Sequence, residues 1–142
     1  MNDDEIQFDH VAMPVGDIER AVEFYQRVLG AKPLGLEKWR EGKAIAVSIS
    51  FGRQKFNLHP PDNRIMLKAA HPMVGGGDYC FVWPGTIKSA AEHLERLGIE
   101  IIEGPVFRIG GRGKGMSVYF RDPDGNLLEL ISYAEPPPPR PA

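Results

Sequence analysis

One pattern of elements occurs twice along this chain of 142 residues. In each half, a short strand of alternating side chains precedes a capped amphipathic helix, and a loop and a two-strand hairpin follow. The helix ends at Leu29-Gly30 in the first half and at Leu97-Gly98 in the second, a shift of 68 positions. A repeated supersecondary unit predicts two modules of the same topology.

Residue periodicity predicts the individual elements. Two helices are predicted, 18–29 with Asp17 as N-cap and Gly30 at its end, and 87–97 with Thr86 as N-cap. Strands are predicted at residues 6–15, 44–51, 55–59, 78–83, 99–102 and 116–120, and in the segment that returns from the turn at 122–126. Segment 31–43 is predicted to be a loop or an irregular strand, and the segment 104–115, rich in Gly and Arg/Lys, a loop.

Composition limits the class of protein. Hydrophobic residues at 42% and charged residues at 25% are typical of a globular domain, and a net charge of -2 gives no electrostatic reason to expect nucleic acid or an anionic membrane as a partner. The N-terminal sequence is acidic where a signal peptide would be basic and apolar, and no apolar run is long enough to span a bilayer. The one cysteine, Cys80, excludes an internal disulfide and fits a reducing compartment. We therefore expect a soluble cytoplasmic protein.

The last hairpin carries a carboxylate in apolar surroundings. The Pro-Asp-Gly sequence within 122–126 supplies the backbone freedom that a tight turn needs. In the returning strand the side chains alternate between faces, so Leu127, Glu129 and Ile131 share one face. Burying a carboxylate there is costly unless it is protonated, paired or bound to a cation, so we expect Glu129 to have a partner.

The repeat pairs four residues that can bind a metal. The shift of 68 places His10 over Asp78, and a shift of 70 between the hairpins places His59 over Glu129. Curved sheets turned toward each other would bring these four side chains to one centre. Two imidazoles with one or two carboxylates and no thiolate suit a divalent Fe, Mn, Co, Ni or Zn ion. Taken alone, these residues also have structural interpretations: a hydrogen-bonded strand histidine for His10, a strand-end residue for His59 and a turn cap for Asp78.

A second group of polar residues lies in segment Ile109–Gly115, which holds Arg112 and Lys114 among four glycines. The segment is either a solvated flexible loop or a lid whose two cations close on a carboxylate or phosphate of the substrate.

Four stretches of the chain have the form of family motifs. They are 9–12 (DHVA), 21–25 (AVEFY) followed by Leu29-Gly30, 104–106 (GPV) and 120–129 (FRDPDGNLLE). In these stretches the chain resembles the vicinal oxygen chelate superfamily, which includes glyoxalase I, extradiol dioxygenases, fosfomycin-resistance enzymes and bleomycin-resistance proteins. The resemblance covers nearly all of residues 6–133 and is greatest to the small glyoxalase-like proteins.

The resemblance implies an α+β fold of two βαβββ modules, whose curved mixed sheets form a shared cleft. A single domain would cover residues 6–133, with module one at 6–62, a linker at 63–77 and module two at 78–133. A Pro-rich tail, 134–142, would follow in an extended conformation.

The resemblance also implies a metal site on the first and last strands of the modules. His10 and Glu129 match ligand positions of the family, and His59 stands at the corresponding last strand of module one. Asp78 departs from the pattern, since family members often have His there. Asp78 is therefore interpreted as a ligand, a general base or a partner of a ligating histidine.

The implied function is that of a divalent-metal-dependent, glyoxalase-like enzyme that chelates vicinal oxygens of a small substrate, with Glu129 and Asp78 as catalytic residues. Isomerase or lyase chemistry is the first expectation, and ring-cleaving dioxygenation the second. The alternative is a metal-free protein of the bleomycin-resistance kind that sequesters a small ligand, and a weaker one is a purely structural metal site. A homodimer is what the family implies.

Overall fold

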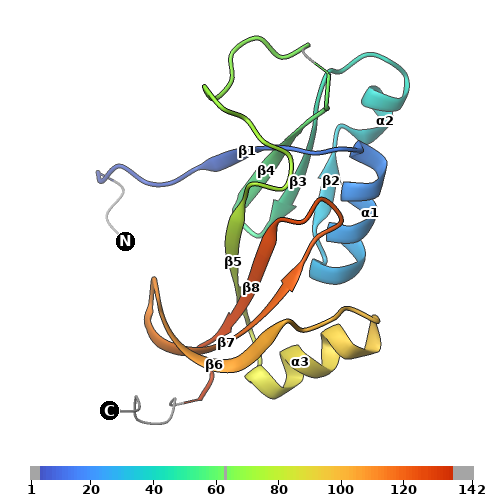
Figure 1. Cartoon of the computed structure of the whole chain (residues 1–142). Coiled ribbons are helices and arrows are strands. Elements are labelled where there is room, and N and C mark those ends of the chain that lie inside the picture. Colours follow the sequence, from blue (N-terminus) through green and yellow to red (C-terminus); the bar gives the residue numbers. More distant parts are fainter. Residues whose placement is uncertain (1–3, 63, 136–142) are drawn as a thin grey trace. The chain divides into compact units, whose positions relative to one another are not determined.

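The longest helix begins and ends as the sequence predicts. Helix α1 (Ile18–Leu29) starts after Asp17, whose side chain accepts a hydrogen bond from the Arg20 backbone N–H, and it ends at Gly30 in the left-handed conformation. Its apolar stripe packs against one face of a four-stranded sheet (Figure 1). The structure, a computed structural model, describes residues 4–62 and 64–135.

Module one is the compact unit formed by residues 1–74. Its remaining elements are β1 (His10–Pro14), β2 (Lys32–Leu34), α2 (Leu36–Arg40), β3 (Val47–Phe51) and β4 (Gln54–His59). The strand order is β1-β4-β3-β2, with β1 parallel to β4 and the other pairs antiparallel (Figure 1). Buried side chains from α1, β3 and β4, including an edge-to-face cluster around Tyr25, form the core.

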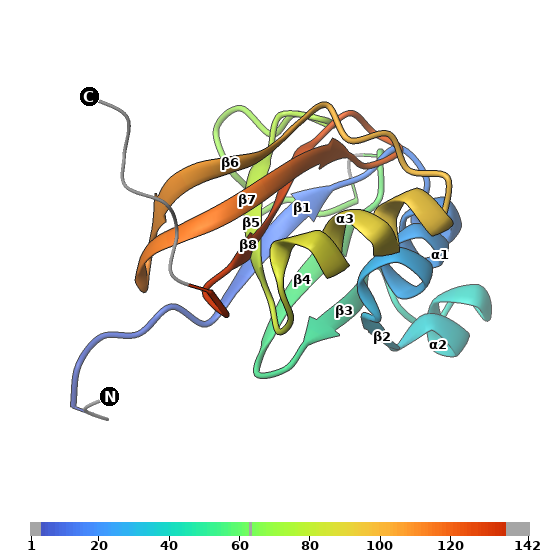
Figure 2. The ribbon, with the colours of Figure 1, turned by 90° about the horizontal axis from the view of Figure 1, so that it is seen from below.

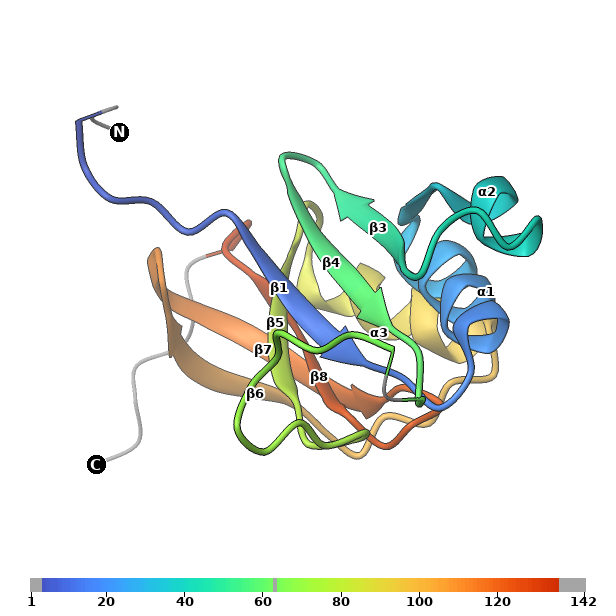
Figure 3. The ribbon, with the colours of Figure 1, turned by 90° about the horizontal axis from the view of Figure 1, so that it is seen from above.

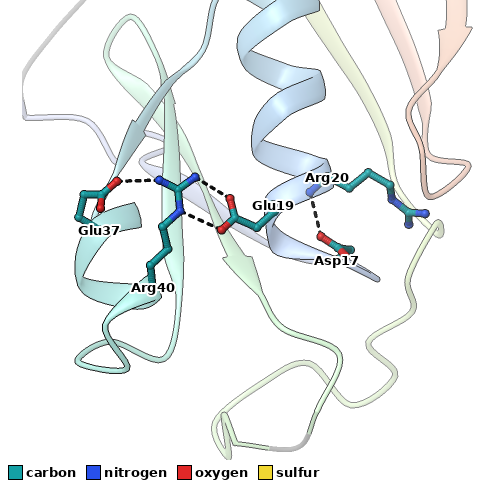
Figure 4. A network of polar contacts seen from close by, with 5 residues as sticks. All are labelled: Asp17, Glu19, Arg20, Glu37 and Arg40. Carbon is teal, nitrogen blue, oxygen red and sulfur yellow. Dashed lines mark hydrogen bonds and ion pairs between the residues drawn. The ribbon is translucent and has the colours of Figure 1, made fainter.

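The short helix α2 lies in segment 31–43, where we predicted only a loop or an irregular strand. It begins at Gly35, which provides no side-chain cap, and it has no buried residue. Arg40 instead donates two hydrogen bonds to the Glu19 carboxylate on α1, at 2.9 and 2.7 Å, and one to Glu37 at 2.7 Å (Figure 4). These bonds raise the pKa of Arg40 and lower that of Glu19. A tertiary ion-pair network therefore supports α2, which no local pattern indicated.

Module two is the compact unit formed by residues 75–142. Its elements are β5 (Asp78–Trp83), α3 (Ile87–Arg96), β6 (Glu103–Gly110), β7 (Gly113–Arg121) and β8 (Leu127–Ser132). The strand order β5-β8-β7-β6 repeats that of module one, again with the first strand parallel to the last, and α3 packs on one face of the sheet (Figure 2). The predicted α+β fold of two βαβββ modules with mixed sheets is confirmed.

Two predictions in module two are wrong. Residues 99–102 do not form a strand, and the predicted loop 104–115 is most of a β-hairpin made by β6 and β7. The glycines of this segment allow close packing: a Cβ at Gly110 would collide with Tyr133, and one at Gly115 would lie 2.9 Å from both Ile131 and the Ser132 carbonyl. Glycine content here reflects close approach rather than flexibility.

The turn between β7 and β8 fastens the start of β5. Asp122 accepts hydrogen bonds from the backbone N–H groups of Asp124 and Asn126 and from the Asn126 side chain, at 2.7 to 2.9 Å. The Asn126 side-chain oxygen then accepts the Gly77 N–H at 2.7 Å, and the Leu127 N–H donates to the Gly77 carbonyl at 3.0 Å. Both backbone groups of the residue before Asp78 are thus held by the turn.

The unit boundary between residues 74 and 75 falls inside the expected linker 63–77. Of the expected Pro-rich tail, residues 136–142 lie outside the described part of the chain. Within residues 4–62 and 64–135, no helix combines the length and apolarity required to cross a membrane.

Candidate functional site

His10 stands at the start of β1 and is exposed. Its Nδ1 lies 2.7 Å from the Asp9 carboxylate, which is almost fully solvated. The segment before the strand, residues 4–9 (Figure 3), has no regular secondary structure apart from a turn at residues 4–5, and Ile6 and Phe8 in it are exposed.

The last strand of module one places polar side chains on the face opposite the core. Phe56 and Leu58 of β4 are buried, so Lys55, Asn57 and His59 face the other way. Ser48 donates a hydrogen bond to the Asn57 side-chain oxygen at 2.8 Å. Partial burial lowers the pKa of His59 below its usual value, which favours the neutral imidazole.

Strand register corrects the alignment of the two modules. His10 pairs with Lys55 in module one, and Asp78 pairs with Leu127 in module two. Two residues farther along the two ladders, Ala12 lies opposite Asn57 and Cys80 lies opposite Glu129. If His10 and Asp78 are equivalent, Asn57 is the counterpart of Glu129, and the predicted superposition of His59 on Glu129 is wrong.

The length of the hairpin turn explains this error. In module one Phe51 pairs with Gln54, which leaves two residues in the turn, whereas in module two Arg121 pairs with Leu127, which leaves five. A single constant shift in residue number therefore cannot align both the first strands and the last strands of the two modules. His59 lies opposite Pro14, four residues along β1 from His10, or roughly 13 Å at the usual rise of a strand. That spacing separates His59 from His10, whereas Asn57 is half as far along the ladder.

In module two, Asp78 and Glu129 lie on the corresponding strands. Asp78 is exposed at the first position of β5. Glu129 is half-buried, and its Oε2 accepts a hydrogen bond from Ser117 at 2.5 Å. Cys80 and Tyr119 lie opposite Glu129 on the two neighbouring strands, and the Glu129 carboxylate contributes to the raised pKa of both. The partner that the sequence required for Glu129 is therefore supplied by Ser117 of its own module, and burial alone does not require a cation.

The pKa of Cys80 is raised by its surroundings, which include Glu129. Partial burial of the thiol, followed by the negative charges of Glu129 and Asp78, raises the pKa of Cys80 to about 12, although the residue as a whole is exposed. Its thiol is consequently protonated and unreactive at neutral pH.

Arg108 is a polar residue of this face that the sequence analysis missed. Its Nε donates to the Tyr119 hydroxyl at 2.8 Å, and its guanidinium lies 5.3 Å from the centre of the Tyr119 ring. Burial, opposed by the Arg108 hydrogen bond and reinforced by the Glu129 charge, raises the pKa of Tyr119. Reading 104–115 as a strand, with Arg108 opposite Gly115, would have revealed it.

Arg112 and Lys114 lie at the tip of the β6–β7 hairpin. Arg112 occupies the two-residue turn, where its backbone N–H donates to the Tyr133 hydroxyl at 3.3 Å and its guanidinium lies 5.9 Å from the Tyr133 ring centre. Lys114 is exposed on β7 opposite Ile109. The contacts between Arg112 and Tyr133 show that the tip is a folded turn. Binding of a substrate anion by Arg112 and Lys114 stays a prediction.

The donor set fits a divalent cation in chemistry. Asp9 leaves the second ring nitrogen of His10 as the one available for coordination, and Asp78 and Glu129 offer carboxylate oxygens. Within the described part of either module, no three His, Cys, Asp or Glu side chains gather into a cation site. Neither module therefore holds a complete donor set within its described residues.

Comparisons with known proteins agree with this architecture. The model of the Glyoxalase/Bleomycin resistance protein/Dioxygenase superfamily matches residues 7–130. The virulence protein STM3117 of Salmonella typhimurium is 38% identical over 127 residues, which span 89% of this chain and 84% of that protein. The glyoxalase domain-containing protein RDO1 of Mycosarcoma maydis is 39% identical over 127 residues, 89% of this chain and 68% of that protein. Among solved structures, the integron cassette protein VCH_CASS1 of V. cholerae has a TM-score of 0.82 at 38% identity, over 94% of this chain and all of that one.

More distant relatives bear the names of enzymes. The metallothiol transferase FosB of Shouchella clausii is 27% identical over 122 residues, 86% of this chain and 77% of that protein. The structure of lactoylglutathione lyase from Agrobacterium tumefaciens has a TM-score of 0.67 at 25% identity, over 92% of this chain and 96% of that one. With its repeated topology and its matched length, this chain belongs to the Glyoxalase/Bleomycin resistance protein/Dioxygenase superfamily.

Proposed function

We propose that this protein is a divalent-metal-dependent enzyme of the glyoxalase kind that acts on a small molecule with vicinal oxygens. The observation that carries the proposal is the matched register of the two modules. Each module sets a pair of donors at the same offset on its first and last strands, His10 with Asn57 and Asp78 with Glu129. Enzymes among the superfamily's members, such as the metallothiol transferase, support the same reading.

The proposed ligand set is His10 and Glu129, with Asn57 in place of the His59 predicted from the sequence. A bound Fe, Mn, Co, Ni or Zn ion would act as a Lewis acid toward the two substrate oxygens. The hydrogen bond from Ser117 would orient the Glu129 carboxylate for coordination.

Proton movement is the role we propose for Asp78. Asp78 is exposed, whereas Glu129 is half-buried and its carboxylate accepts a hydrogen bond from Ser117. A general base must reach the proton that it removes, and a less constrained carboxylate does so more readily. Isomerisation or lysis is the first proposed reaction type, with ring cleavage by a dioxygenase as the second, and a cytoplasmic homodimer is the proposed state.

Metal binding tests this function directly. Protein stripped of metal is dialysed separately against Mn, Fe, Co, Ni and Zn, and metal per chain is measured for wild type, His10→Ala and Glu129→Ala. About one ion per chain, lost in both variants, is the expected result, and it leads to a screen of α-ketoaldehyde–thiol adducts and catechols for turnover. If the wild type binds none of the five metals, the enzyme proposal fails.

One observation favours a second candidate, a metal-free protein that sequesters a small ligand. Ser117 already supplies Glu129 with a hydrogen-bond partner in the absence of a cation. A binder of this kind would show ligand-induced thermal stabilisation that is unchanged by a chelator. An enzyme with the proposed ligand set would lose that stabilisation when the chelator is added.

A further inference from the structure

The contact between His10 and Asp9 determines which ring nitrogen carries a proton. An ionised carboxylate only accepts hydrogen bonds, and its oxygen lies 2.7 Å from His10 Nδ1. In the neutral imidazole the proton must therefore be on Nδ1. Nε2 is then left with its lone pair, the form in which an imidazole binds a cation.

We propose that Asp9 is a positioning residue that fixes His10 as the Nδ1–H tautomer and makes Nε2 the coordinating nitrogen. The proposal deepens, and rests on, the metal-binding function proposed above. Carboxylates that hold the distal nitrogen of a ligating histidine orient the ring and raise its basicity, and their loss commonly weakens metal binding about 10- to 100-fold.

The geometry of module one gives Asp9 this role by direct contact with the ring. Asp9 lies directly before β1, in segment 4–9, and the ring of His10 is about two-fifths exposed. The contact between the Asp9 carboxylate and Nδ1 is the observation that selects one tautomer. Module two differs, because the residue before Asp78 is Gly77, which has no side chain. The backbone of Gly77 is instead held by hydrogen bonds with Asn126 and Leu127.

The matched control is Glu5→Gln. Glu5 is an exposed carboxylate in the same segment, and its amide variant removes the same charge as Asp9→Asn. A general electrostatic effect would weaken metal binding equally in both variants. A tautomer effect would appear in Asp9→Asn alone, and Asp9→Glu, which can still reach the ring, would restore it in part.

The first measurement is made on the metal-free protein, so it does not depend on the enzyme proposal. Long-range ¹H–¹⁵N correlation spectra at pH 8 identify the protonated nitrogen of His10. We expect Nδ1–H in wild type and Glu5→Gln and a shift to Nε2–H in Asp9→Asn. A wild-type spectrum with Nε2–H, or no change in Asp9→Asn, overturns the proposal.

The second measurement is the dissociation constant for Zn or Ni, obtained by competition with a chromogenic chelator. We expect an increase of at least about tenfold in Asp9→Asn and none in Glu5→Gln. Equal affinity of wild type and Asp9→Asn overturns the proposal even if the tautomer changes. If the wild type has the Nδ1–H tautomer but binds no metal, the proposed metal-binding function fails, and the positioning role of Asp9 fails with it. The spectra then show that the tautomer assignment was correct and that the failure lies in the metal-binding function.

Discussion

The two modules share one topology but hold the start of their first strand in different ways. In module two, both backbone groups of Gly77 are bound by the β7–β8 turn. In module one, His10 follows an exposed segment without strand structure, and the turn between β3 and β4 has only two residues. The two modules therefore share their strand order but not their local contacts. In module two the backbone before Asp78 is held by hydrogen bonds, whereas in module one the side chain of His10 contacts the neighbouring side chain of Asp9.

The largest expected effect is that of Asn126→Ala on stability. The substitution removes the acceptor of the Gly77 N–H and a donor to buried Asp122, and unsatisfied buried groups of this kind cost about 1–3 kcal/mol each. We expect the free energy of unfolding to fall by about 3 kcal/mol in urea titrations. Arg53→Ala in the exposed turn of module one is the control, with a change of less than about 0.5 kcal/mol. Equal effects of the two variants would show that the hydrogen bonds of Asn126 with Gly77 and Asp122 do not stabilise the start of β5.

The second effect is on thiol reactivity. Because its raised pKa of about 12 keeps Cys80 protonated, we expect alkylation at pH 8 to be slower than that of an unperturbed thiol by about a hundredfold or more. Glu129→Gln removes one negative charge and should accelerate the reaction. Ala12 occupies the position equivalent to Cys80, so Ala12→Cys in a Cys80→Ala background tests the same site opposite neutral Asn57. Equal rates for the two thiols would contradict the electrostatic difference between the modules.

A smaller effect is expected at the serines that donate to the last strands. Ser117 donates to a carboxylate and Ser48 to an amide, and hydrogen bonds to charged groups are the stronger ones. We expect Ser117→Ala to lower the free energy of unfolding by about 2 kcal/mol and Ser48→Ala by about 1 kcal/mol, measured by thermal and urea denaturation. A larger loss in Ser48→Ala would reverse the ranking of the two modules.

The smallest effect is that of Arg40→Ala, which removes the network that joins α2 to α1. Exposed ion pairs contribute little to stability and are screened by salt. We expect a small decrease in Tm at low ionic strength that disappears in high salt, together with faster amide hydrogen exchange within α2 and not within α1. Unchanged exchange in α2 would mean that the helix does not depend on Arg40.

Much of the fold could be predicted from local signals. Helix α1 with its Asp17 cap, strand β5 and the last hairpin all follow from capping, periodicity and turn residues. Helix α2 could not be predicted, because it depends on a contact with Glu19 about twenty positions away. Strand β6 was mispredicted as a loop because the segment is rich in glycine. In the structure, Gly110 and Gly115 pack closely against Tyr133 and Ile131.

The candidate site could be predicted only in part. The positions of His10, Asp78 and Glu129 on first and last strands follow from the repeat and are observed. The fourth position could not be found by counting along the sequence, because the two hairpin turns differ in length. Asn57 also lacks the chemical signal of a histidine, so the sequence favoured its metal-capable neighbour His59. The strand register identifies Asn57 as the residue equivalent to Glu129, and the metal-binding role of either residue stays a prediction.

The central claim is that the register of β1 and β4 selects Asn57 and not His59 as the partner of His10. The most direct test compares the Zn or Ni dissociation constants of Asn57→Ala and His59→Ala, with circular dichroism spectra to show that both variants are folded. We predict that Asn57→Ala weakens binding by about tenfold or more and that His59→Ala leaves it unchanged. Loss of binding in His59→Ala with wild-type affinity in Asn57→Ala would contradict the claim.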